Sequence, residues 1–441
     1  MQKRTTDYLV VGAGAMGMAF ADVVFSERPD ARITIVDKRA KPGGHWNDAY
    51  PFVALHQPAA FYGVNSAKLG AGGADLASHA QILAYYERVM NRFLASGRVE
   101  FLPLSEYLGE GRVRSAADDD SGMTFDVRER VVDASYMNVE VPATHGPRYE
   151  ADAGVALVPP NGLAHIRRAW ERYVVIGGGK TGMDAVLFLL DHGVAPGRIR
   201  WIVPHAAWLW NRAVVQPGIA AGELLRQLHA IIEADSVDDV FLRLERQGSV
   251  FRLDRAGLPE KWRCATVNAR ELEKLRTVEQ VSDLGRVQRI TASGIELEQG
   301  RLASDERTLH IDCTADGLAR LQPKPLFSPG GITLQSVFMC QQVFSAALIA
   351  RLELLKLDDE QRNAVCEPVP HPEHKADLPS CVTTSLGNIL DAHRYMPLWL
   401  RRCRLNLMSH ESLLNYCLAA YRARNAVSRA RMSVQRLQSP A

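Results

Sequence analysis

The chain has 441 residues, of which 47% are apolar and 23% are charged, and this is the composition of an ordinary globular protein. The composition excludes a wholly disordered or collagen-like chain, and the length predicts two or three domains. Because 52 Lys and Arg face 50 Asp and Glu, the formal charge is only +2. We therefore expect neither nucleic acid nor a membrane surface as a partner.

Residues 2–22 superficially match a secretory signal with an A-x-A cleavage site. Asp7 interrupts that stretch, and its glycines have the spacing of a nucleotide-binding turn, so we expect these residues to belong to the fold. No other apolar run approaches the ~18 residues that cross a bilayer. The seven cysteines include no C-x-x-C pair, so they do not predict a disulfide framework, and a reducing, cytoplasmic setting is the simpler expectation.

A strand–helix–strand pattern occupies residues 8–37. An apolar strand at 8–11 runs into GAGAMG at 12–17, a helix follows to Glu27, and a second strand ends at Asp37. Glycines at these positions permit the tight turn, the approach of a pyrophosphate and close helix–strand packing, and the terminal acid can bind a ribose. The residues expected to contact this first dinucleotide are Gly12, Gly14, Ala15, Met16, Gly17, Asp37 and Lys38.

The same pattern returns 165 residues later. A strand at 173–176 precedes GGGKTG at 177–182, and after a helix the second strand ends at Val203 without an acid. A 2′-phosphate is tolerated there, and His205 or a nearby arginine (Arg198, Arg200) could hold it, which favours NADP over NAD. The residues expected to contact this second dinucleotide are Gly177, Gly179, Lys180, Thr181, Gly182 and His205.

The remaining patterns are less specific. A capping box at Ser78 predicts a helix to about residue 94, and residues 141–162 read as a linker. Strands are expected within 285–314, and from 340 the chain reads mainly as helix. One amphipathic segment there places five residues on one side: Leu413, Leu414, Cys417, Leu418 and Tyr421. No metal site is expected, because Pro372 prevents a helical H-x-x-H face at His371 and His374.

Two dinucleotide sites in one chain imply a relay, in which one cofactor stays bound and the other visits to deliver a hydride; a flavin is the usual resident. The run KPGGHW at 41–46 resembles the GG-x-W segment of the class B flavoprotein monooxygenases, which include Baeyer–Villiger enzymes. LHQP at 55–58 and DCTADG at 312–317 are similar to two later segments of that family. The resemblance implies FAD on the first motif and NADPH on the second, with further cofactor contacts from Gly44, His45, Trp46 and Asp316 and catalytic roles for His56 and Gln57.

The chain also departs from that family. The linker signature F-x-G-x-x-x-H-x-x-x-W keeps Gly162 and Trp170, but Pro160 replaces the Phe and His165 comes one residue early. The sequence does not match the disulfide-reductase flavoproteins either, because their cysteine pair follows the first strand–helix–strand unit and the first cysteine here is Cys264. A reductase that does not oxygenate, or a flavin-binding regulatory protein, therefore stays open beside a monooxygenase.

We expect an α/β fold with two Rossmann-type dinucleotide-binding domains, the second inserted in the first, and a helical C-terminal region. The predicted parts are an FAD domain at 1–150 and 285–345, an NAD(P) domain at 163–284 and the C-terminal region at 346–441. The resemblance implies an NADPH- and FAD-dependent monooxygenase that inserts one oxygen atom into a small organic substrate through a flavin C4a-(hydro)peroxide. Its partners would be that substrate and dioxygen. The arginines between 422 and 436 are typical of a solvated helix end or of a contact between copies of the chain, so a homo-oligomer stays open.

Overall fold

The structure is a computed structural model that describes residues 2–116, 118–315, 317 and 321–438. Its first unit is an eight-stranded sheet covered by helices. The strands of this unit are β1 (Gln2–Val11), β2 (Ile33–Val36), β3 (Val99–Leu102), β4 (Ser105–Gly109), β5 (Arg112–Ser115), β6 (Asp118–Asp133), β19 (Phe327–Ser328) and β20 (Gly331–Thr333). The helices are α1 (Ala15–Glu27), α2 (His79–Ala95), α8 (Gln342–Glu353) and α9 (Asp359–Val365). The spatial order β19-β20-β6-β1-β2-β3 places β1 inside the sheet, with β5 joining β4 to β6.

The second unit has a parallel five-stranded sheet of order β14-β10-β9-β18-β8 and a four-stranded sheet of order β17-β16-β15-β7. The strands are β7 (Glu150–Ala151), β8 (Leu157–Val158), β9 (Arg172–Ile176), β10 (Ile199–Ile202), β14 (Val281–Ser282), β15 (Val287–Thr291), β16 (Gly294–Leu297), β17 (Gly300–Ala303) and β18 (Thr308–Asp312). The helices are α3 (Pro160–Leu163), α4 (Lys180–Asp191) and α7 (Ala269–Leu275).

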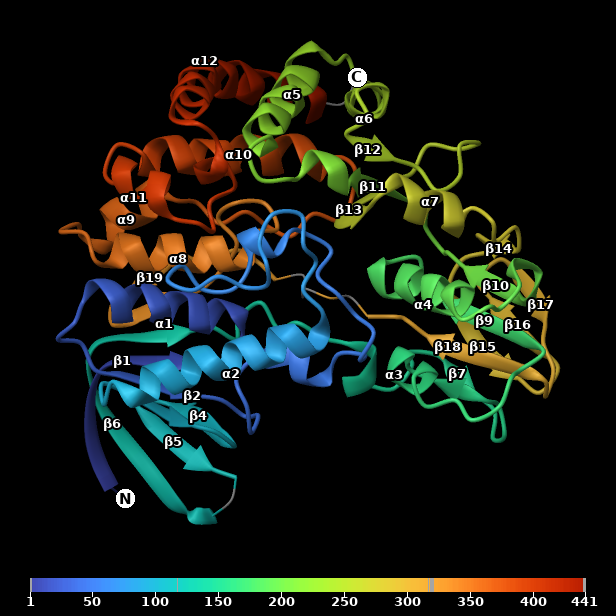
Figure 1. Cartoon of the computed structure of the whole chain (residues 1–441), viewed down its shortest axis with the longest axis horizontal. Helices are drawn as coiled ribbons and strands as arrows, with labels where there is room; N and C mark the ends of the chain where they lie inside the picture. The colour runs from blue at the N-terminus through green and yellow to red at the C-terminus, as the bar shows by residue number, and fades with distance from the viewer. Residues whose placement is uncertain (1, 117, 316, 318–320, 439–441) are drawn as a thin grey trace.

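A third unit combines a three-stranded sheet with the C-terminal helices. Its strands are β11 (Ala207–Asn211), β12 (Val250–Phe251) and β13 (Lys261–Val267), and its helices are α5 (Ala220–Glu233), α6 (Val237–Arg246), α10 (Asp377–Ala392), α11 (Pro397–Arg402) and α12 (Leu413–Gln438). Helix α12 packs on α5 and α10. In Figure 1 these helices form the top of the molecule, above α8 and α1 of the first unit.

The two strand–helix–strand units form as the glycine patterns predict. Strand β1 pairs in parallel with β2 from Tyr8 to Val11, and β9 pairs in parallel with β10 from Tyr173 to Ile176. Both strands are buried because their apolar residues face neighbours on both sides of a covered parallel sheet. The predicted α/β class, the two Rossmann-type units and the helical C-terminal region are therefore confirmed.

Two predicted boundaries differ from the structure. The strands between residues 285 and 312 were expected to return to the first unit, but β18 pairs with β9 and β15 with β7 in the second unit. Residues 207–267 were expected within the second unit, but Trp208, Leu228 and Phe241 share a hydrophobic core with the first unit and the C-terminal helices. Only β19, β20 and α8 carry the chain back to the first sheet and its helices. The predicted linker 141–162 also contains short elements, among them β7, β8 and most of α3.

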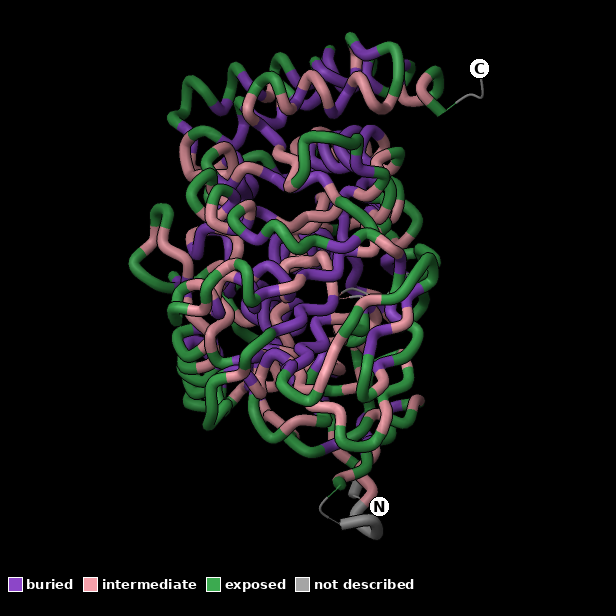
Figure 2. The backbone as a smooth tube through the Cα atoms, turned by 90° about the vertical axis from the view of Figure 1, so that its right-hand side faces the viewer, coloured by how far each residue is buried: buried purple, intermediate pink, exposed green. Residues whose placement is uncertain are grey.

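Helix α12 turns the predicted apolar side outward. Leu413, Leu414 and Tyr421 are between 66% and 69% exposed, whereas the buried side carries small residues such as Ala419 and Ala423. Small side chains let α12 lie close to α5, and that contact decides which side is covered. Figure 2 shows the buried residues running through the middle of the molecule, with exposed segments along its outside. Among the described residues no helix is long and apolar enough to cross a membrane.

Candidate functional site

One cavity of about 1330 Å³ lies where the three units meet, and both glycine turns open into it. Sixteen of the residues expected to form the site line this cavity. They come from both glycine motifs, from the ends of the strands that follow them, and from the segments 41–46 and 55–58. They are Gly12, Gly14, Ala15, Met16, Asp37, Lys38, Gly44, His45, Trp46, His56, Gln57, Gly177, Gly179, Lys180, Thr181 and His205. Gly17 and Gly182 lie behind the wall as packing positions, and Asp316 lies outside the described residues.

The first glycine turn leaves room for a phosphate at the start of α1. Gly12 has φ +111°, which only glycine adopts without strain, and a Cβ on Gly17 would collide with the Gly12 carbonyl. Gly14 precedes α1 without a capping side chain, so the first-turn N–H groups of the helix are not covered by a side-chain oxygen. A Cβ on Gly14 would lie 3.6 Å from the Cα of Gly44, which brings the predicted GG-x-W segment against this turn.

Asp37 closes the turn from the end of β2. Its Oδ2 accepts a hydrogen bond of 2.6 Å from the Ala13 N–H, and its Oδ1 accepts one of 2.7 Å from the Arg39 N–H. The side chain is buried, at 5% exposure, in the cavity wall. The two amides therefore fix the carboxylate at the rim of the turn, where each oxygen keeps a lone pair for a further donor such as a ribose hydroxyl.

The second glycine turn repeats the geometry of the first. Gly177 has φ +123°, a Cβ on Gly182 would collide with the Gly177 carbonyl, and Gly179 precedes α4 as Gly14 precedes α1. Trp201 Nε1 donates a hydrogen bond of 2.8 Å to the Gly177 carbonyl and holds the turn from the neighbouring strand. A Cβ on Gly179 would meet only the Arg263 side chain, at 3.8 Å, so the space in front of the turn is open.

The repeat extends to a third strand in each unit, whose pairing beside the glycine turn the sequence did not predict. Asp133 at the end of β6 lies opposite Val11, and Asp312 at the end of β18 lies opposite Ile176. Each aspartate accepts hydrogen bonds from the N–H and hydroxyl of the residue two places on, Ser135 or Thr314. Residues 312–315, part of the segment 312–317 that resembles a segment of the class B monooxygenases, therefore lie against the second turn, because β18 pairs with β9.

The predicted catalytic residues line the cavity into which the two turns open. Gln57 Oε1 accepts a hydrogen bond of 2.8 Å from Gln341 Nε2, and the His56 carbonyl accepts one of 3.2 Å from Arg212 Nε. Burial, together with the charges of Lys180 and Arg212, lowers the pKa of His56 to about 3, so its imidazole is neutral. Among the described residues its Nδ1 has no hydrogen-bond partner although it is buried.

His45 and Trp46 complete the wall beside the first turn. Burial and the nearby Arg39 lower the pKa of His45 to about 4. Trp46 Nε1 donates a hydrogen bond of 2.7 Å to the Tyr62 hydroxyl, and the Trp46 carbonyl lies 2.7 Å from His79 Nε2. These bonds fix a large aromatic face at the cavity wall.

A basic cluster surrounds His205 at the end of the second unit's strands. Lys261, Arg263 and Arg286 line the cavity with it, and burial together with these charges lowers the pKa of His205. Lys261 Nζ lies 3.0 Å from Glu373 Oε1. Arg263 Nη2 lies farther from the same oxygen, at 3.8 Å. The two arginines proposed from the sequence lie elsewhere: the guanidinium groups of Arg198 and Arg200 donate to backbone carbonyls on the outside of the unit.

Contacts between the units hold the two turns in one cavity. Asp184 on α4 pairs with Lys180 and accepts a hydrogen bond of 2.7 Å from the Tyr50 hydroxyl of the first unit. Two residues of the linker signature play no part in the wall: His165 is exposed, and Trp170 lies under the Arg168 guanidinium at 4.0 Å, outside the cavity lining.

A disulfide joins Cys264 to Cys340 in the cavity wall. The sequence predicted no disulfide framework, and it did not predict this single pair, whose members are 76 residues apart. A spacing of that length carries no local signal, so only the fold could bring the two residues together. The remaining five cysteines are free thiols.

Residues 10–64 match a family model described as an NAD(P)-binding Rossmann-like domain. A protein of Mycobacterium tuberculosis named as uncharacterized is 43% identical over 422 residues, which cover 92% of this chain and 78% of that protein. This chain belongs to the same family. A protein of Mycobacterium bovis, also named as uncharacterized, matches with the same values.

Solved structures show which fold this family has. A closed crystal structure of cyclohexanone monooxygenase matches with a TM-score of 0.51 and 14% identity, over 96% of this chain and 98% of that one. A cyclohexanone-bound structure of cyclohexanone monooxygenase, in a rotated conformation, gives 0.52 and 13% over 82% and 88%. The chain has the two-dinucleotide-domain fold of the class B flavoprotein monooxygenases, as the motifs predict.

Burial of His56 gives the stability of the protein a pH dependence. A histidine in the unfolded chain has a pKa near ~6.5, and His56 has one of about 3 in the folded chain. As the pH falls from about 6.5 toward about 3, His56 takes up a proton in the unfolded state but stays neutral in the folded state. Over this range the free energy of unfolding falls by about 1.4 kcal/mol per pH unit because of His56. In urea denaturation between pH 7 and pH 4, His56→Gln should lose free energy of unfolding less steeply than the wild type.

His165→Gln, at an exposed position outside the cavity, is the control for this measurement. It should follow the wild-type curve. Parallel curves for the wild type and His56→Gln would contradict the burial of an uncharged imidazole at position 56.

Proposed function

We propose that this chain is an NADPH- and FAD-dependent oxidoreductase, a monooxygenase that transfers one oxygen atom of dioxygen to a small organic substrate. One observation carries the proposal: two glycine turns of the same geometry open into a single cavity, which His56 and Gln57 also line. The cyclohexanone monooxygenases with which the chain shares its fold support the reaction class.

The first turn fits a resident FAD. The start of α1 offers uncovered N–H groups to a pyrophosphate, and Gly44 lies close enough to Gly14 to wall in that position. Asp37 is oriented by two amides at the end of β2, where a ribose would lie. Bound FAD would supply the ability to accept a hydride and to react with dioxygen.

The second turn fits NADPH. The strand β10 is followed by Pro204 and His205 instead of an acid, and Lys261, Arg263 and Arg286 lie around that strand end. Glu373 is shared by the first two of these cations, and Glu298 accepts from the Arg286 backbone N–H. Three cations with two carboxylates leave the cluster positive, which suits a 2′-phosphate.

His56, Gln57 and Gln341, which line the cavity, are suited to bind and orient a polar group. His56 is neutral, and its Nδ1 is a buried polar atom without a partner among the described residues, as is Gln341 Oε1. Buried polar atoms are ordinarily hydrogen-bonded, so these two positions are suited to a bound ligand. Gln57, held by Gln341, faces the same space and can hydrogen-bond the reacting oxygen, while Trp46 and Leu55 exclude water from that side.

Gly14→Ala and Gly179→Ala separate the roles of the two turns. At both positions a Cβ has room in the protein, with its nearest neighbours at 3.6 Å and 3.8 Å, but it occupies the approach path of a pyrophosphate. Gly14→Ala should lower FAD affinity by about tenfold or more, and Gly179→Ala should keep FAD but slow its reduction by NADPH.

Gly146→Ala is the matched control, because a Cβ there meets nothing within 4 Å among the described residues. Flavin absorbance after gel filtration and stopped-flow reduction are the measurements. FAD retention that is lost in Gly179→Ala and kept in Gly14→Ala would reverse the assignment of the two turns.

Arg263→Gln and Arg286→Gln test the nucleotide preference. A charge-assisted hydrogen bond to phosphate contributes about 1.5–3 kcal/mol, so each change should raise KM for NADPH about ten- to a hundredfold and leave KM for NADH nearly unchanged. Arg200→Gln is the control, because that guanidinium donates to the Ala303 carbonyl and to Gln280. Equal rises of KM for the two nucleotides would show that the cluster does not read the 2′-phosphate.

The reaction class is tested by mixing the anaerobically NADPH-reduced protein with oxygenated buffer in a stopped-flow spectrometer. A monooxygenase shows an absorbance transient that is neither reduced nor oxidised flavin before the oxidised spectrum returns. Direct return of the oxidised spectrum would identify a reductase or oxidase. Failure of the protein to take up FAD, or failure of NADPH to bleach it, would overturn the proposed function altogether.

A further inference from the structure

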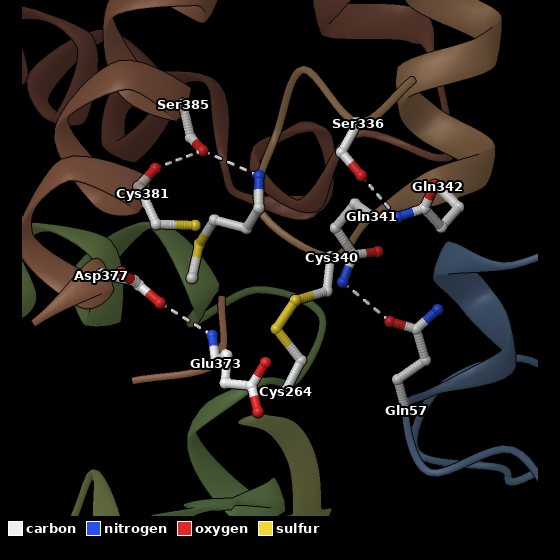
Figure 3. The surroundings of a disulfide bond; sticks show 11 residues. Gln57, Cys264, Ser336, Cys340, Gln341, Gln342, Glu373, Asp377, Cys381 and Ser385 are labelled. Carbon is white, nitrogen blue, oxygen red and sulfur yellow. Dashed lines mark hydrogen bonds between the residues drawn. A yellow bond between two sulfur atoms is a disulfide. The ribbon is translucent and has the colours of Figure 1, made fainter. Parts of the chain in front are cut away.

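The disulfide between Cys264 and Cys340 lies in the wall of the cavity. Cys264 is on β13 of the third unit, and Cys340 is in the loop before α8 of the first unit, with 6.3 Å between their Cα atoms. Figure 3 shows the bond between these two segments, with Glu373 beside Cys264 and Gln57 across from Gln341. Both cysteines are half-buried and line the cavity.

The pairing register between β11 and β13 shifts in the segment of β13 that contains Cys264. Trp208 and Trp210 of β11, two residues apart, pair with Trp262 and Thr266 of β13, four residues apart. The two additional residues of β13 form a bulge that contains Cys264. Bulges of this kind occur next to active sites, where they redirect a side chain out of the regular pleat.

The backbone beside Cys340 is also unusual. Met339 has φ +43°, a left-handed conformation that is rare for a residue with a side chain, and its N–H donates a hydrogen bond of 2.7 Å to Ser385 Oγ. The preceding Val337 N–H donates to Ser345 Oγ at 3.0 Å. The surrounding helices therefore hold this loop in a conformation that it would not adopt alone, as is common at functional sites.

The other cysteines indicate that the pair is not part of a structural framework. Five thiols stay free, and burial raises the pKa of four of them, at Cys313, Cys366, Cys381 and Cys403, so these stay protonated. In a reducing compartment, such as the cytoplasmic setting expected from the sequence, a disulfide is usually catalytic or redox-sensing. Both paired cysteines line the cavity into which the two glycine turns open, as does the free thiol of Cys313.

Close to each cysteine in sequence, one residue makes a hydrogen bond to the segment that contains His56 and Gln57. Thr266, two residues after Cys264, donates its hydroxyl to the His56 carbonyl. Gln341, directly after Cys340, donates to Gln57. The disulfide therefore bridges the two segments that hold His56 and Gln57 in place.

We propose that Cys264 and Cys340 form a second redox centre of this cavity, which takes an electron pair from the reduced flavin and passes it to a small-molecule disulfide. The inference rests on the proposed function, because that flavin is reduced by NADPH. In the first half, two electrons and two protons leave the reduced flavin, the S–S bond breaks and two S–H groups form. In the second half, the dithiol exchanges with a disulfide R–S–S–R, which leaves as two R–SH while the Cys264–Cys340 bond reforms.

Counting thiols in the wild-type holoenzyme tests the inference without any variant. Alkylation in denaturant followed by mass spectrometry should find five free thiols in the isolated protein and seven after anaerobic reduction by excess NADPH. After anaerobic removal of NADPH, an excess of 2-hydroxyethyl disulfide should return the count to five and release four equivalents of its thiol per chain, two for the dithiol and two for the reduced flavin. A count of seven before reduction would overturn the inference, and so would a count of seven that the added disulfide does not change.

The same sample separates this inference from the proposed function. A bleached flavin with five thiols overturns the redox pair alone, whereas a flavin that NADPH does not bleach overturns the proposed function and the inference with it. Anaerobic titration with dithionite should consume four electrons per chain in the wild type, two for the flavin and two for the disulfide, and two in the C264S/C340S double variant. The control C417S changes an exposed free thiol and should still consume four.

Discussion

The position of the cavity depends on a close contact between the backbone of a strand end and the backbone of the following helix. This contact occurs in both glycine turns. In each glycine turn the carbonyl at the end of a strand, at Gly12 or Gly177, touches the first turn of the following helix at Gly17 or Gly182. No side chain fits between them, so the helix axis is set against the strand and its N-terminus faces the same edge of the sheet. The third strand of each unit, ending at Asp133 or Asp312, then packs against the turn from the other side.

The two turns share one cavity because contacts between the units hold them face to face. The Tyr50 hydroxyl reaches Asp184 at the start of α4, and Arg212, with Glu271 at 2.8 Å, binds the His56 carbonyl. Arg404 donates to the carbonyls of Ala60 and Val64, which ties the C-terminal helices to the first unit. The C-terminal region is therefore packed against the first unit and is not a separate appendage.

The local elements followed from the sequence because short-range rules decide them. The helix ending at Glu27 and the helix that begins with the capping box at Ser78 have the predicted bounds or lie within a residue of them. In each, the deciding contact spans a few residues: a glycine turn, a capping side chain or an alternation of apolar residues. Half of the predicted site residues that line the cavity belong to the same class, since they are residues of the two glycine motifs.

Long-range pairing decided the rest. The sequence alone determined that there are two Rossmann-type turns, that the first has an acid at its strand end and the second does not, and that the C-terminal region is helical. Only the tertiary structure decided that β18 joins the second sheet, that Lys261, Arg263 and Arg286 surround His205, and that Cys264 meets Cys340. The reason is physical: an isolated arginine or cysteine has the same local preferences wherever it stands, and its neighbours are chosen by the packing of segments far apart in the chain.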